Sequence, residues 1–268
     1  MANDRILYLI VGRTGSGKST LEKKLVEHGF TTVKSYATRP ARTPDEDTHI
    51  FISDEEADAL IPDAVAQTQI GKYRYFATQQ QVENADVYVI DPNGVDEICQ
   101  KVTDRAIHII YVIADEKNRR AHAIARESDH ESAAKAFDER QSAEDARFIT
   151  FEKNLDSYTA LPSPVTMVHN LFNTYQDADL EGEAIRISNQ QQMHVNLVKV
   201  VKRAVQRGFL DADETGIKLI NQDNETVCVT PSYAADILAD DKDFYLPLMD
   251  WWLAQPDVDA DKSFAGNE

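Results

Sequence analysis

The stretch Gly12-Arg13-Thr14-Gly15-Ser16-Gly17-Lys18-Ser19 decides how the chain folds. It matches the pattern G-x-x-x-x-G-K-[ST], whose glycines let successive backbone N–H groups turn inward around phosphate oxygens. The apolar run Ile6 to Val11 before it predicts a buried parallel strand, and Ser19 to His28 after it predicts a helix that stops at Gly29. A glycine-rich turn between such a strand and such a helix is typical of a phosphate-binding loop, or P-loop.

The P-loop pattern assigns a role to each polar member. Lys18 is expected to bridge the β and γ phosphates of ATP, and the Ser19 hydroxyl is expected to coordinate Mg²⁺. Thr20 follows, with a hydroxyl expected near the α-phosphate. ATP and Mg²⁺ are therefore the expected cofactors. Their expected binding set is Gly12, Thr14, Gly15, Ser16, Gly17, Lys18, Ser19 and Thr20.

Strands and helices alternate along the first 185 residues. The apolar runs predict strands at Thr31–Ser35, Ile50–Ile52, Tyr73–Ala77, Asp86–Ile90, Ala106–Ile113 and Val165–Val168. Helices are predicted at Asp54 to Ile61, where Ser53 and Glu56 have the spacing of a capping box, and from Asp115 to about Leu155. This alternation predicts an α/β fold, a P-loop NTPase sandwich with a mainly parallel sheet.

The alternation stops near Ile185. Gln190 to Gln206 is predicted to be helical, with Val195, Val198, Val201 and Val205 on one stripe, and Ile217–Ile220 and Val227–Val229 flank a polar turn at 221–224, which predicts a hairpin. After Gly208 there are 14 acidic residues and three lysines. We therefore expect two domains, a P-loop domain at 1–185 and a small acidic α+β appendage at 186–268.

The appendage carries apolar side chains that must pack on something. Besides the valine stripe it has an aromatic cluster of Phe244, Tyr245, Trp251 and Trp252. Such surfaces are covered either by the rest of the chain or by a second copy. The sequence leaves both open, and a homodimer through this segment is one expectation.

Composition excludes several classes of protein. The chain has 268 residues with 42% apolar residues, enough for a real core, and a formal net charge of -18. That charge repels nucleic-acid phosphates, so a nucleic-acid partner is not expected. No apolar run approaches the length of a membrane span and no secretion signal is evident, which predicts a cytoplasmic location without a membrane partner. Cys99 and Cys228 are expected to be unpaired thiols.

Two segments resemble guanylate kinases. Leu9 to Thr20 looks like the start of that family, and Ser35-Tyr36-Ala37-Thr38-Arg39-Pro40-Ala41-Arg42 is similar to its S-x-T-T-R-x-x-R segment, which clamps the phosphate of the acceptor nucleotide. The resemblance implies that Ser35, Arg39 and Arg42 hold that phosphate. The chemistry agrees, because two guanidiniums on one loop can converge on a single dianion. The resemblance covers roughly residues 5 to 175.

Further resemblances extend the acceptor site. Gly71 to Thr78 is similar to the family's G-x-Y-Y-G-T segment, which implies that one of Tyr73 and Tyr75 faces the acceptor. Asp86 to Gly94 resembles the family's strand that ends in D-I-D-x-Q-G. That match implies that Asp91 holds Mg²⁺ through water or contacts the acceptor.

Arginines in the long helical stretch resemble the family's lid. Arg119, Arg120, Arg126 and Arg140 match its R-R…R…R series. Arginines that close from a lid stabilise the charge of a migrating phosphoryl group and exclude water. The resemblance therefore implies that Arg119, Arg126 and Arg140 act in catalysis together with Lys18.

The sequence departs from the family at two places. The family's phosphate-binding tyrosine falls on His49, and the glutamate that reads guanine has no counterpart between Asp63 and Gln69. The acceptor base is therefore open, with dGMP, dTMP or a modified deoxynucleotide as candidates. The acidic tail and the divergent lid would suit a bacteriophage enzyme.

These features favour ATP-dependent phosphorylation of a (deoxy)nucleoside monophosphate to the diphosphate. Two alternatives stay open, a kinase that acts on a modified base or nucleotide in DNA and a non-catalytic nucleotide-binding module derived from the kinase fold. The intact Lys18 and Ser19 argue against the second alternative, because such modules typically lose the lysine.

Overall fold

A four-stranded parallel sheet forms the centre of the protein. The computed structural model describes residues 4–41, 43–125, 129–159, 164–174, 177–220, 225–240 and 242–255. The strands lie in the order β6 (Val87–Val89), β1 (Leu7–Val11), β7 (Ile107–Ile113) and β8 (Val165–Phe172), and all neighbours run parallel. The predicted α/β sandwich with a parallel sheet is confirmed.

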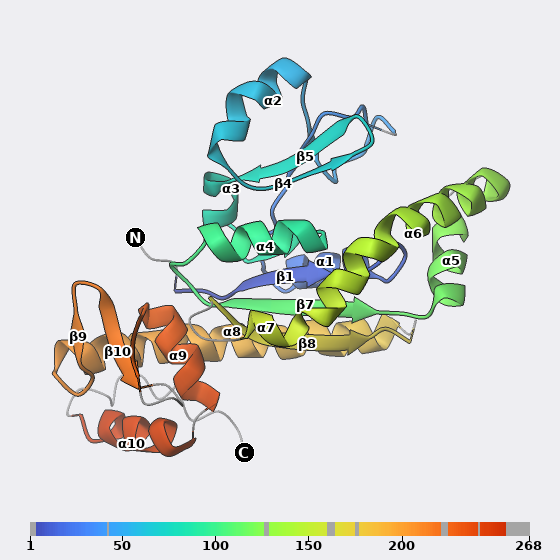
Figure 1. The fold of residues 1–268 in the computed structure, drawn as a ribbon. Helices are drawn as coiled ribbons and strands as arrows, with labels where there is room; N and C mark the ends of the chain where they lie inside the picture. Colours follow the sequence, from blue (N-terminus) through green and yellow to red (C-terminus); the bar gives the residue numbers. More distant parts are fainter. Residues whose placement is uncertain are drawn as a thin grey trace.

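Helices cover both faces of this sheet (Figure 1). Because side chains alternate along a strand, Leu7, Leu9 and Val11 face one core and Tyr8 and Ile10 face another. The first core is closed by α4 (Pro92–Lys101) and α6 (His130–Lys153), and the second by α1 (Lys18–Glu27) and α8 (Asp177–Gln206). The β1 residues have no exposed surface, which explains their continuous apolar run.

A second sheet lies above α4 in Figure 1. Its order is β3 (Ile50–Phe51), β2 (Tyr36–Ala37), β5 (Tyr73–Thr78) and β4 (Ala64–Ile70). The helix α2 (Asp54–Leu60), followed by a short 3-10 turn, η1 (Ile61–Asp63), crosses over it, and α3 (Gln79–Glu83) leads back to β6. The predicted capping box of α2 is confirmed, because Glu56 N–H donates to Ser53 Oγ at 3.2 Å and Ser53 N–H donates to the Glu56 carboxylate at 2.8 Å.

The predicted strand Thr31–Ser35 is wrong. This segment forms one isolated bridge to β6, and β2 begins only at Tyr36. The Asp86 carboxylate engages the donors of Thr31, because it accepts both the N–H and the hydroxyl of Thr31 at 2.9 Å. Side-chain bonds of this kind compete with strand pairing.

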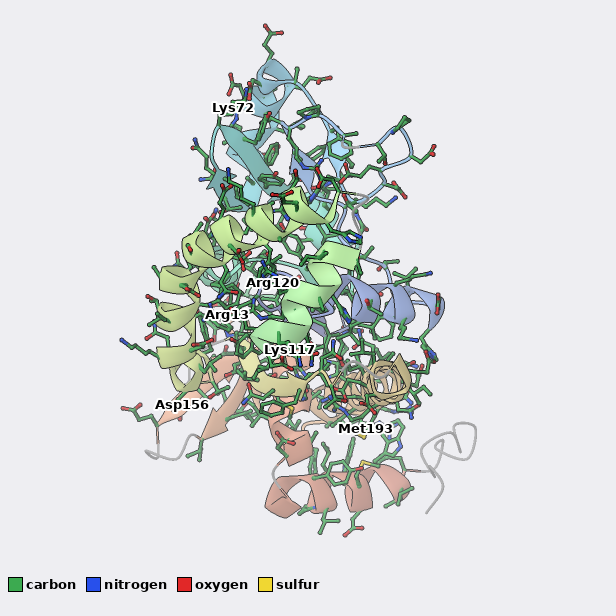
Figure 2. All side chains as sticks on the ribbon, turned by 90° about the vertical axis from the view of Figure 1, so that its right-hand side faces the viewer. Arg13, Lys72, Lys117, Arg120, Asp156 and Met193 are labelled. Carbon is green, nitrogen blue, oxygen red and sulfur yellow. The ribbon has the colours of Figure 1, made fainter. Side chains whose placement is uncertain are left out.

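The helical stretch predicted from Asp115 to Leu155 divides into two helices that pack side by side, α5 (Glu116–Ala125) and α6, with a single turn, α7 (Leu155–Tyr158), after them. In Figure 1, α5 and the start of α6 lie at the right-hand end of the molecule, and this end faces the viewer in Figure 2. Arg120 joins the pair through an ion pair with Asp138, 3.2 Å apart. This end of the molecule lies next to the P-loop.

The C-terminal part has its own core around the second half of α8. The predicted hairpin is confirmed as β10 (Gly216–Ile220) and β11 (Thr226–Val229), with β9 (Ala212–Asp213) on the other side of β10, and its turn at 221–224 lies outside the described residues. Two helices complete it, α9 (Pro231–Asp240) and α10 (Lys242–Leu253). Val198 and Val201 of the expected stripe are fully buried here.

The expected domain boundary at residue 185 falls inside α8, which runs without a break through 30 residues. Leu180, Ala184 and Ile187 pack on the central sheet, whereas Leu197 and Val200 pack on the appendage. One helix therefore belongs to both cores. The division of the chain into two domains stays a prediction.

A buried polar network joins the appendage to the central sheet. Nε2 of His108 on β7 lies 2.7 Å from the Asp236 carboxylate on α9, and His194 on α8 lies 3.4 Å from its other oxygen. Burial alone would raise the pKa of Asp236, but the two histidines hold it well below its usual range. The Ser232 hydroxyl also accepts the N–H of Ala106 at 3.1 Å. In Figure 1 the appendage lies at the end of the sheet opposite α5.

Among the helices that the described ranges contain, none has the length and apolar character to cross a membrane.

Candidate active site

The P-loop joins β1 to α1, and its glycines are required by geometry. Gly15 and Gly17 have φ angles of 80° and 103°, in the left-handed region that favours glycine. A Cβ on Gly15 would lie 2.3 Å from the carbonyl oxygen of Arg119. The loop is held from below by Asn173, whose side-chain amide donates to the Ser16 carbonyl at 2.7 Å. The loop is therefore a fixed cradle with backbone donors.

Lys18 lies over this cradle. Its ammonium donates to the carbonyl oxygens of Gly12 at 2.6 Å and Arg13 at 3.1 Å, which keeps the charge next to the loop. Ser16 is fully buried, and its hydroxyl has no hydrogen-bond partner among the described residues. A close-packed glycine turn, a lysine and an unpaired buried hydroxyl are chemically suited to a phosphate chain.

A cavity of about 400 Å³ opens in front of the P-loop. It is bounded by the P-loop, by β4 and β5 of the second sheet, by the start of α4 and by one face of α6. Eight of the residues expected from the sequence line it: Gly12, Thr14, Lys18, Ser35, Arg39, Tyr75, Asp91 and Arg140. The fold therefore brings part of the P-loop, four of the expected acceptor residues and one expected lid arginine together around one space.

Other expected residues lie elsewhere. Tyr73 does not line the cavity, so Tyr75 is the tyrosine of that pair that faces it. Gly15, Ser16, Gly17, Ser19 and Thr20 form the loop and the start of α1 without lining the cavity. Arg42 and Arg126 lie outside the described residues.

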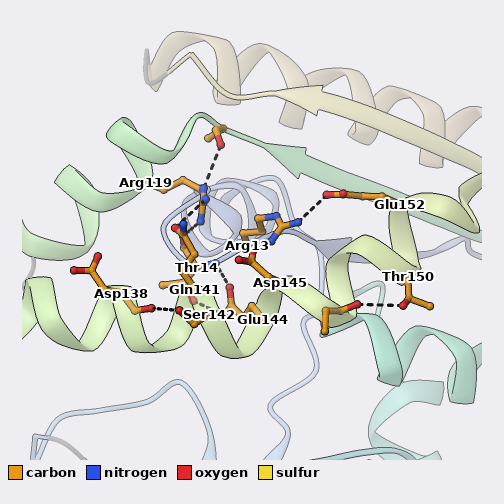
Figure 3. Close-up of polar contacts among 12 residues, drawn as sticks. Arg13, Thr14, Arg119, Asp138, Gln141, Ser142, Glu144, Asp145, Thr150 and Glu152 are labelled. Carbon is orange, nitrogen blue, oxygen red and sulfur yellow. Dashed lines mark hydrogen bonds and ion pairs between the residues drawn. The ribbon is translucent and has the colours of Figure 1, made fainter.

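Arg119 supports the P-loop from behind. Its guanidinium donates to the carbonyl of Thr14 at 3.3 Å, to that of Ala114 at 3.2 Å and to the Gln141 side chain at 3.3 Å (Figure 3). It also lies over the ring of Phe137. The side chain is buried among these partners and does not line the cavity.

The far wall of the cavity carries the expected phosphate clamp. Nη1 and Nη2 of Arg39 donate to the Glu46 carboxylate at 2.9 and 2.6 Å, which raises the pKa of Arg39, and its guanidinium lies over Phe51. Nε of Arg39 is buried without a hydrogen-bond partner in the described structure. A phosphate at this position would find one free donor on a guanidinium that Glu46 already orients.

His49 completes this wall. Its Nδ1 lies 2.9 Å from the Ser35 hydroxyl, and its ring meets that of Tyr75 edge to face, with centroids 5.4 Å apart. The histidine at the family's tyrosine position therefore lines the cavity beside Ser35 and Tyr75.

Asp91 caps α4 at the edge of the cavity. Its Oδ1 accepts the N–H groups of Asn93 at 2.8 Å and Gly94 at 3.1 Å, so the carboxylate sits at a fixed place at a helix N-terminus. Its Oδ2 makes no hydrogen bond to any described residue. Mg²⁺ in such sites takes one or two protein oxygens and fills its shell with water and phosphate, so the Ser19 hydroxyl and the Asp91 carboxylate are chemically suitable ligands.

The face of α6 towards the P-loop was not predicted. Glu144 accepts hydrogen bonds from the N–H of Thr14 at 2.9 Å and from its hydroxyl (Figure 3). Two other carboxylates of the same helix form ion pairs with Arg13 of the P-loop, Asp145 at 2.5 Å and Glu152 at 3.2 Å. Arg147 also lines the cavity. The spacing of residues 140, 144 and 147 on one helical face was the signal that could have found them.

The wall formed by β4 is neutral. Ala66, Gln67, Thr68 and Ile70 line it, whereas Asp63 precedes the strand and does not. Asp91 and Glu144 are the cavity's carboxylates within the described residues, and neither belongs to β4. No carboxylate on β4 therefore replaces the glutamate that the sequence lacks between Asp63 and Gln69.

Comparison with known proteins finds similarity among solved structures. No protein-family model and no curated protein matches the chain. Among solved structures, it is similar to a guanylate kinase from Anaplasma phagocytophilum, with 18% identity and a TM-score of 0.48 over 79% of this chain and 100% of that one. It is also similar to an uncharacterized protein from Eubacterium ventriosum ATCC 27560, with 13% identity and a TM-score of 0.35 over 70% of this chain and 98% of that one.

Proposed function

We propose that the protein transfers the γ-phosphoryl group of ATP to a (deoxy)nucleoside monophosphate. The observation that carries the proposal is one cavity that Lys18 of the P-loop, Ser35 and Arg39 all line. A triphosphate on the loop and a monophosphate on the opposite wall would meet inside it. Holding both reactants in one cavity is the main requirement of phosphoryl transfer, which asks for little covalent chemistry from the protein.

The residues that line the cavity have different roles, according to the wall on which they lie. The P-loop N–H groups and Lys18 hold the donor phosphates, and Ser19 and Asp91 would hold Mg²⁺, which neutralises charge on the phosphates when bound. Ser35, His49 and the Nε group of Arg39 hold the acceptor phosphate, with Arg42 as the further expected ligand. No general base is needed, because a phosphate oxygen of the acceptor is already nucleophilic.

The acceptor is proposed to be read by a neutral wall. A buried carboxylate selects guanine strongly, because it pairs with the N1–H and N2–H₂ groups and is left unpaired by other bases. Gln67 and Thr68 offer an amide and a hydroxyl instead, and each can both donate and accept. We therefore infer that GMP is not the uniquely preferred acceptor.

An ADP-release assay across all ribo- and deoxynucleoside monophosphates tests the proposal. We expect turnover with at least one monophosphate and a preference for GMP of less than about a thousandfold over the next acceptor. A short oligonucleotide with modified bases serves as a further acceptor. Turnover of the oligonucleotide alone would replace the proposal by the DNA-kinase alternative, and ATP binding without any turnover would favour the non-catalytic module.

A further inference from the structure

Three charged residues of α6 face the cavity in a regular pattern. Arg140, Glu144 and Arg147 all line it, and their spacing of four and three residues places them along one face of the helix. Arg140 is the arginine that the sequence singled out. The sequence did not predict Glu144 and Arg147 as site residues, because it does not show which face of α6 meets the cavity.

The P-loop fixes the middle residue of this row. Glu144 accepts from the Thr14 N–H at 2.9 Å and from the Thr14 hydroxyl. A glutamate between two arginines at these spacings could form an ion pair with either of them. Here its carboxylate is engaged by Thr14 instead, so it forms an ion pair with neither arginine.

Both arginines therefore carry a charge without a counter-ion. Across the described residues, neither Arg140 nor Arg147 has a hydrogen bond or an ion pair, although Arg147 is half-buried. Other arginines near the site do have acidic partners, namely Arg13, Arg39, Arg74 and Arg120. In a chain with 46 acidic and 28 basic residues, two unpaired guanidiniums at one cavity indicate a site for an anion.

The row also locates that anion. Residues three or four apart on a helix have Cβ atoms about 5 to 6 Å apart, so Arg140 and Arg147 lie one turn on either side of the residue that touches Thr14. Both arginines line the cavity in front of the P-loop, where the terminal phosphate of a bound triphosphate is expected, and Arg147 lies on the side of α4, beside Pro92 and Asn93. Arg39 on the opposite wall is the candidate for the acceptor phosphate.

We propose that Arg147 is a further catalytic residue, which binds the phosphoryl group while it moves from ATP to the acceptor. This inference rests on the proposed function. In that step the bond from the γ-phosphorus to the β–γ bridging oxygen breaks, and ADP leaves with the electron pair on that oxygen. An acceptor phosphate oxygen bonds to the same phosphorus. Negative charge spreads over the migrating group, and the planar forks of Arg140 and Arg147 stabilise it from two sides.

The test compares Arg147→Ala, Arg147→Lys and a matched control, Lys135→Ala. Lys135 lies on the same helix, is exposed and does not line the cavity, so its removal changes the charge of α6 by the same amount. Thermal unfolding of each variant shows that it is folded. We expect Arg147→Ala to lower kcat by about a hundredfold with both KM values changed by less than about threefold. Arg147→Lys should recover a small part of the lost kcat, because lysine keeps the positive charge but lacks the bidentate guanidinium.

Two results would overturn the assignment. A folded Arg147→Ala variant with a kcat within about twofold of wild type would show that the guanidinium takes no part in transfer, and a loss confined to the acceptor KM would make Arg147 a ground-state binding residue. Failure of the proposed function looks different, because the wild-type protein itself would then bind ATP and phosphorylate none of the monophosphates.

Discussion

The carboxylate of Glu144 on α6 occupies both hydrogen-bond donors of Thr14 in the P-loop, the backbone N–H at 2.9 Å and the side-chain hydroxyl. It lines the same cavity as Lys18, so a negative charge stands where a triphosphate is expected. Nucleotide binding must therefore overcome repulsion from this carboxylate or move it away from Thr14.

Glu144→Gln should strengthen ATP binding. The glutamine oxygen can still accept from the Thr14 N–H, and its NH₂ group can donate to the Thr14 hydroxyl, but the negative charge is gone. A like charge about 4 Å away is worth about 1 kcal/mol in water and about 4 kcal/mol at an effective dielectric constant of 20. We expect ATP affinity to rise by about fivefold or more in titration calorimetry without acceptor. Glu139→Gln, an exposed position on the same helix, is the control and should leave the affinity unchanged. Weaker ATP binding by the Gln variant would mean that the Glu144 carboxylate stabilises the P-loop conformation that binds ATP.

Arg39→Ala should weaken acceptor binding far more than ATP binding. Glu46 and Phe51 hold the guanidinium in place, and its Nε has no hydrogen-bond partner among the described residues. Loss of a charge-assisted contact should cost about 2 to 4 kcal/mol of acceptor binding. Separate titrations with ATP and with the monophosphate that the assay identifies measure both effects.

Arg74→Ala is the control for this change, since Arg74 on β5 pairs with Asp54 and Asp58 outside the cavity. Equal weakening of both substrates by Arg39→Ala would show that Arg39 does not belong to the acceptor site.

Stability should fall as pH drops from about 6.5 towards 4 because of His169. Its burial, followed by the charges of His108 and Arg186, lowers the pKa of His169 to about 4 from an ordinary 6.5. Between these values the unfolded chain binds a proton that the folded protein does not, so the free energy of unfolding rises with pH in this window. The effect at pH 5 should be at most about 2 kcal/mol.

Urea unfolding at pH 7 and pH 5 measures this slope. His169→Asn removes the titrating group while keeping a polar side chain beside His108, and its slope should be smaller than that of wild type. An unchanged slope would mean that other groups carry the pH dependence.

The appendage is proposed to form a homodimer. Ile220, Leu246 and Leu253 are 66%, 58% and 65% exposed, and Phe209 stacks on Trp251 while remaining 41% exposed. Large apolar side chains gain by being covered, and a second copy is the expected cover. Sedimentation equilibrium should give twice the chain mass of 30.2 kDa, and Ile220→Glu with Leu253→Glu should return the monomer. A wild-type monomer at all concentrations would refute this proposal without touching the P-loop site.

Local sequence patterns predict more of the fold than of the candidate site. The β1–P-loop–α1 unit and the Ser53 capping box depend on neighbouring residues, so the sequence predicts them closely. The strand β4 was missed because Ala64–Ile70 mixes apolar and polar residues around an irregular register at Ala64 and Ala66. The helix α4 begins with Pro92, Asn93 and Gly94, which are turn formers by composition, and it depends on Asp91 as its cap.

In the candidate site, too, residues within sequence motifs were predicted and residues placed by distant contacts were not. Ser35, Arg39 and Tyr75 were candidates because each lies in a motif, whereas Glu144 and Arg147 lie in a helix of 24 residues rich in charge. Which face of such a helix meets the P-loop depends on how α6 packs through Phe148 and Phe151, and that is set by contacts distant in sequence. Arg119 fitted a motif, yet its position behind the loop depends on the turn from β7 into α5.

Product analysis with ATP, Mg²⁺ and the best monophosphate, for the wild-type protein and for Lys18→Ala, tests directly whether the P-loop cavity transfers a phosphoryl group. Lys18 lies at the P-loop and lines the cavity, so its loss should leave the fold intact and reduce phosphoryl transfer by several orders of magnitude. We expect stoichiometric ADP and nucleoside diphosphate from the wild type and neither product above background from the variant. Wild-type rates and ATP affinity in a folded Lys18→Ala protein would contradict phosphoryl transfer from ATP bound at the P-loop.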